Sequence, residues 1–180
     1  ASLAAVQALI RAIEFSGTNN APGAQARTVT FLLENGAVAT TIQPTVQVTV
    51  NAVDDPTVAV ADAVAVNESG TVLINALSND TDVDAFLDTV ITVGGQAIAA
   101  GGTVTLASGA RVTLTLDGQL LYDPNGAFDY LADPASGTAL TAATDSFTYG
   151  LSGGASAQVD IALTGETSAE DILRGDGNAN

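Results

Sequence analysis

The segments Ser146–Gly154 (SFTYGLSGG) and Ala157–Gly165 (AQVDIALTG) carry the pattern that decides the fold. In both of them apolar and polar residues alternate, and a glycine-rich turn separates the two. The alternating apolar residues are Phe147, Tyr149, Val159, Ile161 and Leu163. A period of two places successive side chains on opposite faces of a β-strand, so each segment predicts a strand with one buried face. Together they predict an antiparallel hairpin.

The same period of two recurs through most of the chain. Its apolar positions include Val29, Phe31, Val46, Val48, Val50, Val104, Leu106, Val112, Leu114 and Leu116. Pairs such as Asp117-Gly118 and Asn125-Gly126 supply the turns between these runs. Short strands at this spacing predict an all-β chain folded as an antiparallel Greek-key β-sandwich. The exception is Ser2–Ile13, where apolar residues recur every three or four positions and predict one short N-terminal helix.

The composition narrows the chemistry to carboxylates. The chain has 20 Asp and Glu against 4 Arg, no Lys, and a formal net charge of -16. It has no Cys, His, Met or Trp, which excludes a thiol or imidazole nucleophile, a disulfide scaffold and a zinc site of the usual type. The few scattered arginines exclude a basic patch for nucleic acid. No apolar run approaches the roughly 20 residues of a membrane span, so we expect no membrane insertion.

Carboxylates can also be catalytic, as in glycosidases, which place two of them about 5 to 9.5 Å apart around a sugar. With 20 acids, however, such pairs arise without any function. A sugar cleft usually offers aromatic platforms, and this chain has only 3 Tyr and 5 Phe. We therefore expect that the protein is not an enzyme.

An internal repeat divides the chain. Residues 28–36 (TVTFLLENG) and 45–53 (TVQVTVNAV) follow the same order as residues 146–154 and 157–165. In both cases a strand, a polar turn with glycine and a second strand follow one another. The repeat predicts that residues 1–53 are the C-terminal half of one sandwich and that residues 57–165 are a complete second copy. Residues 54–56 (DDP) form the linker, because proline ends a strand ladder and adjacent carboxylates resist burial. Residues 166–180 form a polar tail.

The densest acidic segment is Asn79–Asp84 (NDTDVD), with Asp88 four residues further on. Alternating carboxylates favour a hard cation that takes six to eight oxygen ligands, which indicates a Ca²⁺ loop. The loop is not an EF-hand, because its sixth position is Ala85 and its twelfth is Ile91. The alternative is a solvated polar turn between two strands.

A second set of acids surrounds the linker. Asp54, Asp55 and Asp62 lie in or just after it, and Glu68 follows in the next turn. If the linker packs against the acidic segment, these groups converge at one pole of the second sandwich. Like charges gathered in this way repel one another unless a cation joins them. The alternative is that a linker is polar in any case.

Five motifs in order resemble the tandem cadherin-like or Ig-like repeats of large secreted bacterial adhesins. They are Val50–Pro56 (VNAVDDP), Asn67–Gly70 (NESG), Asn79–Asp84 (NDTDVD), Asp117–Pro124 (DGQLLYDP) and Asp145–Tyr149 (DSFTY). The sequence departs from the family pattern at Ala85-Phe86, where a glycine and an acid are common, and in a linker without the usual asparagine. The tail segment Asp171–Asn178 (DILRGDGN) is similar to the Gly-Asp-rich calcium repeats (RTX repeats) of proteins exported by a type I route.

The resemblance implies a bacterial protein that is secreted or held at the cell surface, with Ca²⁺ bound between neighbouring repeats. The candidate calcium ligands are Asp54, Asp55, Asp62, Glu68, Asp80, Asp82, Asp84 and Asp145. The expected function is a calcium-rigidified spacer or adhesion repeat, whose partners are the neighbouring repeats and a cell-surface glycan or protein. The alternative is a lectin-like domain that contacts a carbohydrate or surface directly through its bound Ca²⁺.

Overall fold

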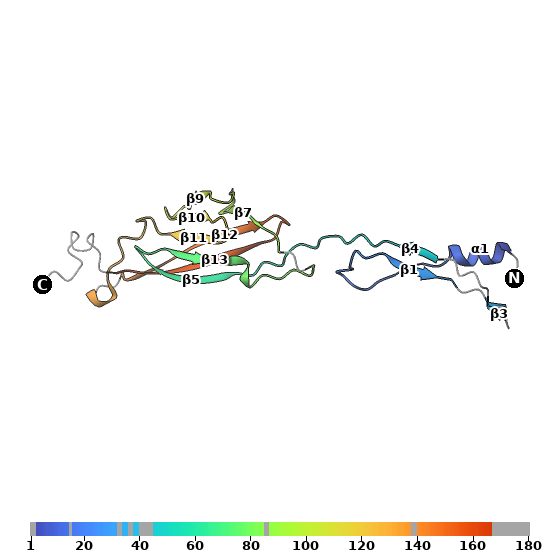
Figure 1. Cartoon of the computed structure of the whole chain (residues 1–180). Coiled ribbons are helices and arrows are strands. Elements are labelled where there is room, and N and C mark those ends of the chain that lie inside the picture. The colour runs from blue at the N-terminus through green and yellow to red at the C-terminus, as the bar shows by residue number, and fades with distance from the viewer. Residues whose placement is uncertain are drawn as a thin grey trace. The chain divides into compact units, whose positions relative to one another are not determined.

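A computed structural model describes residues 3–14, 16–31, 34–35, 38–39, 45–84, 87–137 and 140–166 of the chain. The chain forms two compact units, residues 1–54 and 55–180 (Figure 1). The boundary between the two units falls between Asp54 and Asp55. Whether the first unit is half of another sandwich stays a prediction.

The described residues of the first unit form one helix and four short strands. They are α1 (Leu3–Arg11), β1 (Arg27–Thr30), β2 (Glu34–Asn35), β3 (Val38–Ala39) and β4 (Thr45–Val48). The helix lies within the predicted range, because apolar spacing of three and four residues suits only a helix. β1 pairs antiparallel with β4, with Val29 opposite Val46, and β2 pairs with β3.

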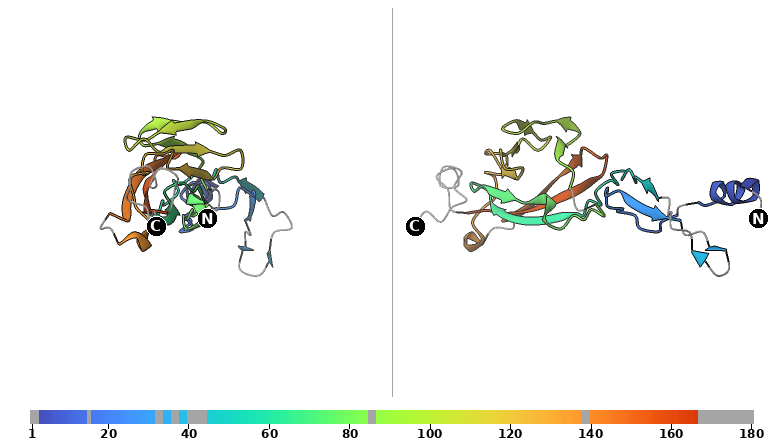
Figure 2. Two further views of the ribbon diagram at one scale, coloured as in Figure 1. Left: turned by 90° about the vertical axis from the view of Figure 1, so that its left-hand side faces the viewer. Right: turned by 45° about the vertical axis from the view of Figure 1, so that its right-hand side comes forward.

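The second unit is a sandwich of two sheets (Figures 1 and 2). Its strands are β5 (Asp62–Asn67), β6 (Val72–Ile74), β7 (Val90–Val93), β8 (Gln96–Ala97), β9 (Thr103–Thr105), β10 (Arg111–Leu114), β11 (Leu120–Asp123), β12 (Ala142–Leu151) and β13 (Ser156–Thr164). Its described residues also form the 3₁₀ turns η1 (Ala76–Ser78) and η2 (Pro134–Ser136). One sheet has the order β5-β13-β12-β7-β8 and the other β6-β11-β10-β9. The predicted all-β sandwich with one short helix is confirmed.

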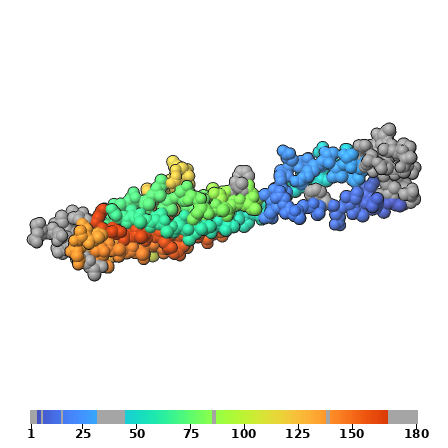
Figure 3. All heavy atoms as spheres, turned by 90° about the horizontal axis from the view of Figure 1, so that it is seen from below, coloured from blue at the N-terminus to red at the C-terminus, as the bar shows by residue number. Residues whose placement is uncertain are grey.

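The hairpin predicted for residues 146–165 is present. β12 pairs antiparallel with β13, and Phe147 lies opposite Val159. β5, however, pairs parallel with β13, so the prediction of an antiparallel sandwich was wrong for this pair. A period of two is the same in parallel and antiparallel strands, so it cannot reveal strand direction. In Figure 3, β5 (green) and β13 (red) run side by side along the second unit.

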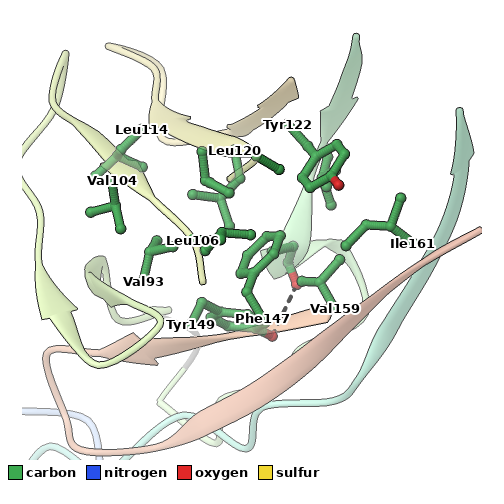
Figure 4. Close-up of a cluster of buried hydrophobic side chains, with 14 of the residues drawn as sticks. Val93, Val104, Leu106, Leu114, Leu120, Tyr122, Phe147, Tyr149, Val159 and Ile161 are labelled. Carbon is green, nitrogen blue, oxygen red and sulfur yellow. Dashed lines mark hydrogen bonds between the residues drawn. The ribbon is translucent and has the colours of Figure 1, made fainter. Parts of the chain in front are cut away.

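The core lies between the two sheets of the second unit (Figure 4). The five alternating apolar residues of the β12–β13 hairpin are all at most 5% exposed and face the other sheet. Tyr122 stacks on Phe147 at a centroid distance of 6.5 Å, which joins β11 to β12 across the core. Leu116 departs from the pattern: it lies in the turn after β10 and is 88% exposed. The alternation of buried and exposed residues along β10 therefore ends at Leu114, two residues earlier than predicted.

Candidate metal centre

Two segments of the second unit lie against each other at the start of the sandwich. The entry segment, residues 55–60, leads into β5, and the acidic loop, residues 79–84 with Asp88, connects η1 to β7. Val58 and Thr81 form a single antiparallel bridge, with N–H to O distances of 2.7 and 3.2 Å. The bridge explains why the carboxylates on either side of Thr81 reach the entry segment.

Four carboxylates of the acidic loop accept hydrogen bonds from the entry segment. The bonds run from Val60 N to Asp80 Oδ1 (2.7 Å), from Thr57 Oγ1 to Asp82 Oδ2 (3.1 Å), from Asp55 N to Asp84 Oδ2 (2.8 Å) and from Thr57 N to Asp88 Oδ2 (3.2 Å). Asp82 Oδ1 also accepts from Asp84 N at 2.7 Å, which shapes the loop itself. The alternating acids that predicted a cation loop thus also fasten the entry segment.

Thr57 is the centre of this contact and is only 2% exposed. Its hydroxyl donates to Asp82 and accepts from Asp88 N at 2.9 Å, while its own N–H donates to Asp88. Thr57 is not among the residues predicted for the site from the sequence. Its position directly after Pro56 could have indicated this role. Proline has no N–H for regular strand pairing, so a polar side chain beside it is free to bond to a loop instead.

Asp88 has two further donors besides the entry segment. Ser152 Oγ donates to Asp88 Oδ1 at 2.6 Å, and the backbone N–H of Gly153 also points at the carboxylate. These hydrogen bonds, led by that of Ser152, hold the pKa of Asp88 below its usual value. Asp88 is therefore a carboxylate that the protein already stabilises in its charged form.

Asp80 lies deeper, at 8% exposure, against the hydroxyl of Tyr149. The Tyr149 oxygen lies 3.1 Å from both oxygens of Asp80, 3.2 Å from Val60 O and 3.3 Å from Ala76 O. One hydroxyl proton thus serves four acceptor oxygens. Burial, and then the bond to Asp80, raise the pKa of Tyr149 well above its usual value, so the hydroxyl stays a donor. The sequence pattern predicted Tyr149 only as a core residue.

Asp62, at the start of β5, has surroundings that disfavour its charged form. Its Oδ2 atom is buried and accepts no hydrogen bond in the described part of the chain. Burial, and then the charge of Asp80, raise the pKa of Asp62 to about 6, against an opposing hydrogen bond from Asn79. Arg111, the one arginine in the described part of this unit, lies in β10 of the other sheet.

The expected convergence of all the linker acids with the loop was wrong for Glu68. Glu68 follows β5, whose six residues span roughly 20 Å in the extended conformation, and Asp62 stands at the other end. Glu68 is 1% exposed, and its Oε1 accepts from Glu166 N at 3.2 Å. Sequence proximity to the linker misled the prediction, because an intervening strand carries the chain across the whole sandwich.

Asp145 also lies apart from the acidic loop. It stands within β12, and its carboxylate accepts from Ser108 Oγ, Tyr122 OH and Ser146 N, each at 2.8 Å. Asp55 is tied to the loop through Asp84, whereas Asp54 is the last residue of the first unit. Whether any of these residues binds calcium stays a prediction. The predicted calcium repeats of the tail begin beyond Glu166, outside the described residues.

The described residues contain no group of three or more acidic side chains already arranged as a metal cage. They do contain the neighbouring carboxylates of Asp62 and Asp80. The carbonyl oxygens of Val60 and Ala76 lie close by, within hydrogen-bond distance of the Tyr149 hydroxyl that also contacts Asp80. All of these are hard oxygen atoms of the type that Ca²⁺ takes as ligands. Within the described residues, the Oδ2 of Asp62 accepts no hydrogen bond. Whether these oxygens bind an ion stays a prediction.

The sequence of the second unit is similar to a known protein family. Residues 53–165, well over half of the chain, match the family model for the bacterial cadherin-like domain. No curated protein matches the chain. Within the described residues, no helix combines the length and apolarity needed to cross a bilayer. The matched range contains the whole sandwich with its acidic loop and entry segment. The chain therefore belongs to the family of bacterial cadherin-like domains.

Proposed function

We propose that the second unit is an extracellular module that binds Ca²⁺ at the start of the sandwich and serves as a spacer repeat of a surface or secreted protein. One observation carries the calcium proposal. Among the described residues, the buried Oδ2 of Asp62 has no hydrogen-bond donor, and it lies within the electrostatic reach of Asp80. The one arginine described in this unit, Arg111, lies in the other sheet. Two carboxylates in this arrangement destabilise the fold unless a proton or a cation joins them.

Calcium is the cation that this chemistry favours. The chain has no His or Cys to select zinc or copper, and its side chains and backbone offer carboxylate, amide, hydroxyl and carbonyl oxygens as ligands. Asp62 and Asp80 would hold the ion, and Asp82 and Asp84 would supply further oxygens because each lies within the same loop. A bound ion would neutralise part of the repulsion that a net charge of -16 imposes on the folded chain.

The spacer role is supported by the position of carboxylates at both ends of one sandwich. Asp62 and Asp80 lie where the chain enters, and Glu68 and Glu166 lie where it leaves. In a series of such modules, acids from two successive units would meet at each junction. The partners in this proposal are therefore neighbouring modules of the same protein, and the family match supports an extracellular location.

Calcium should raise the melting temperature of the sandwich. A ligand that binds only the folded state adds about 2.7 kcal/mol at one hundred times its Kd, or roughly 5 to 10 °C for a domain of this size. The measurement is thermal unfolding in excess Ca²⁺ and in EDTA at equal ionic strength. Asp80→Asn should abolish most of the shift.

Asp160→Asn is the matched control, because Asp160 is exposed on the outer face of the same sheet. It removes the same charge and should keep the calcium shift. Identical melting curves of the unmodified protein with and without calcium would end the calcium proposal. Equal loss of the shift in both variants would reduce the effect to general charge screening.

A further inference from the structure

The long strand β12 is covered on only part of one edge. It pairs with β13 from Ala142 to Gly150, but β7 pairs with it only between Tyr149 and Leu151. β7 then turns away at Gly94-Gly95 into β8. Along residues 142–147 of β12, no strand among the described residues occupies the side opposite β13.

The direction of the backbone groups on this edge follows from a single bond. Gly94 N donates to Thr148 O at 2.8 Å, so the N–H and C=O of Thr148 point toward the β7 side. Because the backbone groups of a strand alternate in direction, those of Ala142, Thr144 and Ser146 point to the same side. These residues therefore form an open edge.

A cavity of about 400 Å³ borders this edge and keeps it accessible. Its lining includes Gln96 from β8, Leu106 and Ser108 from the turn after β9, and Ser146 and Phe147 from β12. Ser146 and Thr144 are both exposed. The edge thus faces open space, and an extended chain could reach it.

Asp145 occupies the middle of the open edge. Its Oδ1 accepts from Ser146 N at 2.8 Å, which removes one edge donor from the reach of another chain. Its Oδ2 accepts from Ser108 Oγ and Tyr122 OH, which belong to the opposite sheet and its turn and fix the carboxylate in place. Burial, and then the bond to Asp145, raise the pKa of Tyr122 far above its usual value, so this donor is permanent.

We propose that Asp145 prevents the open edge of β12 from pairing with the same edge of a second copy of the chain. An unpaired strand edge is a template for edge-to-edge association, and an inward-pointing charged residue is one of the devices that block it. Two copies related by a twofold axis would pair residues 142–147 antiparallel. They would then bring two Asp145 carboxylates into one interface, where like charges destabilise the pair.

The test replaces Asp145 in a background that leaves no buried hydroxyl without its acceptor, since Ser108, the other hydroxyl that donates to Asp145, is exposed to water. Tyr122→Phe keeps the stack on Phe147 and removes the donor that would otherwise lose its partner. Tyr122→Phe alone should sediment as a monomer at all concentrations. Tyr122→Phe/Asp145→Ala should form a dimer whose fraction rises with concentration, measured by sedimentation velocity in 0.5 M NaCl to screen the net charge.

Two controls tie the dimer to the edge. Tyr122→Phe/Asp160→Ala removes the same charge from the neighbouring strand and should stay monomeric. Adding Thr144→Pro to the Asp145 variant should abolish its dimer, because the proline removes an edge N–H and no bond to β13. A folded Asp145 variant that stays monomeric would overturn the proposal, and so would a dimer that survives Thr144→Pro.

A measurement on the unmodified protein covers the case in which the Asp145 variant fails to fold. If Asp145 caps Ser146, the Ser146 amide should exchange hydrogen several-fold more slowly than the amide of Thr144, an exposed residue of the same edge. Residue-resolved hydrogen exchange by NMR measures both rates in the same sample. Equal rates at the two positions would show that the carboxylate does not protect the edge and would overturn the proposal.

Discussion

Carboxylates of one small region differ in what their surroundings do to them. Asp88 receives hydrogen bonds from Ser152 and Thr57, and its pKa is lowered. Asp62 is partly buried near Asp80, one of its oxygens accepts no hydrogen bond from the described residues, and its pKa is raised to about 6. Donors stabilise the charged form and burial destabilises it, so identical side chains take opposite roles.

The raised pKa of Asp62 predicts a pH dependence in the absence of calcium. In the unfolded chain an aspartate titrates near 3.9, so between about pH 4 and pH 6 the folded state binds more protons than the unfolded state. The contribution of Asp62 to stability is therefore present below pH 4 and is lost as the pH rises through 6. Asp62→Asn should be more stable than the unmodified protein at pH 7 in EDTA, and the advantage should shrink toward pH 4.

Urea denaturation at pH 4.5 and pH 7 measures this difference. Saturating calcium should reverse its sign at pH 7, because the bound ion then needs the charge that the variant lacks. An advantage of Asp62→Asn that is the same at both pH values would contradict the assignment.

The hydroxyl of Tyr149 provides a second test at the level of one residue. Tyr149→Phe leaves Asp80 with the Val60 N–H as its remaining hydrogen-bond donor among the described residues. Loss of a buried hydrogen bond to a charged group costs about 1.5 to 3 kcal/mol of unfolding free energy, so we expect a loss of that size in EDTA. Denaturant unfolding checks it. A loss below about 0.5 kcal/mol would mean that water replaces the hydroxyl at once.

At the scale of elements, the decisive contact is that between the entry segment and the acidic loop. The two share a single backbone bridge, at Val58 and Thr81, and side chains supply the remaining bonds. Regular pairing is impossible here because Pro56 lacks an N–H and the loop is not extended. The acidic loop therefore has a structural role whether or not it binds calcium.

Thr57→Val tests that role. The substitution keeps the shape of the side chain but removes the bond donated to Asp82 and the bond accepted from Asp88 N. We expect a loss of about 2 to 3 kcal/mol, at about 1 kcal/mol or more for each buried bond. Thr148→Val, on the exposed outer face of β12, should change stability by less than about 0.5 kcal/mol. Similar effects in the two variants would show that the entry segment is held by something else.

At the scale of the whole molecule, the spacer proposal concerns how firmly successive units are joined. The chain forms two compact units, and junctions between domains of one chain are mobile by default unless they are large and apolar. Calcium bound by Asp62 and Asp80 would order the entry segment, which is the first part of the second unit.

Small-angle X-ray scattering of the 180-residue chain should therefore give a narrower distribution of interatomic distances in calcium than in EDTA. Asp80→Asn should remove the difference, and Asp160→Asn should keep it. An unchanged distribution, together with a calcium-dependent melting temperature, would leave calcium as a local stabiliser and remove the spacer role.

The sequence by itself determined the parts of this protein that depend on local periodicity. Alternation over β12 and β13 placed Phe147, Val159 and Ile161 in the core, because a strand sends successive side chains to opposite faces. Spacing of three and four residues placed the single helix. The density of carboxylates in the acidic loop located the candidate metal centre for the same reason, since charge and residue type are local properties.

Only the tertiary structure decided which distant residues meet. Periodicity carries no strand direction, so the parallel pairing of β5 with β13 was hidden, and with it the separation of Glu68 from Asp62 by a full strand length. Thr57 and Tyr149 became parts of the candidate site because the chain folds back on the loop at those points. The place of Asp145 on a partly open strand edge was also hidden, because strand order and the length of β7 are set by packing over the whole sandwich.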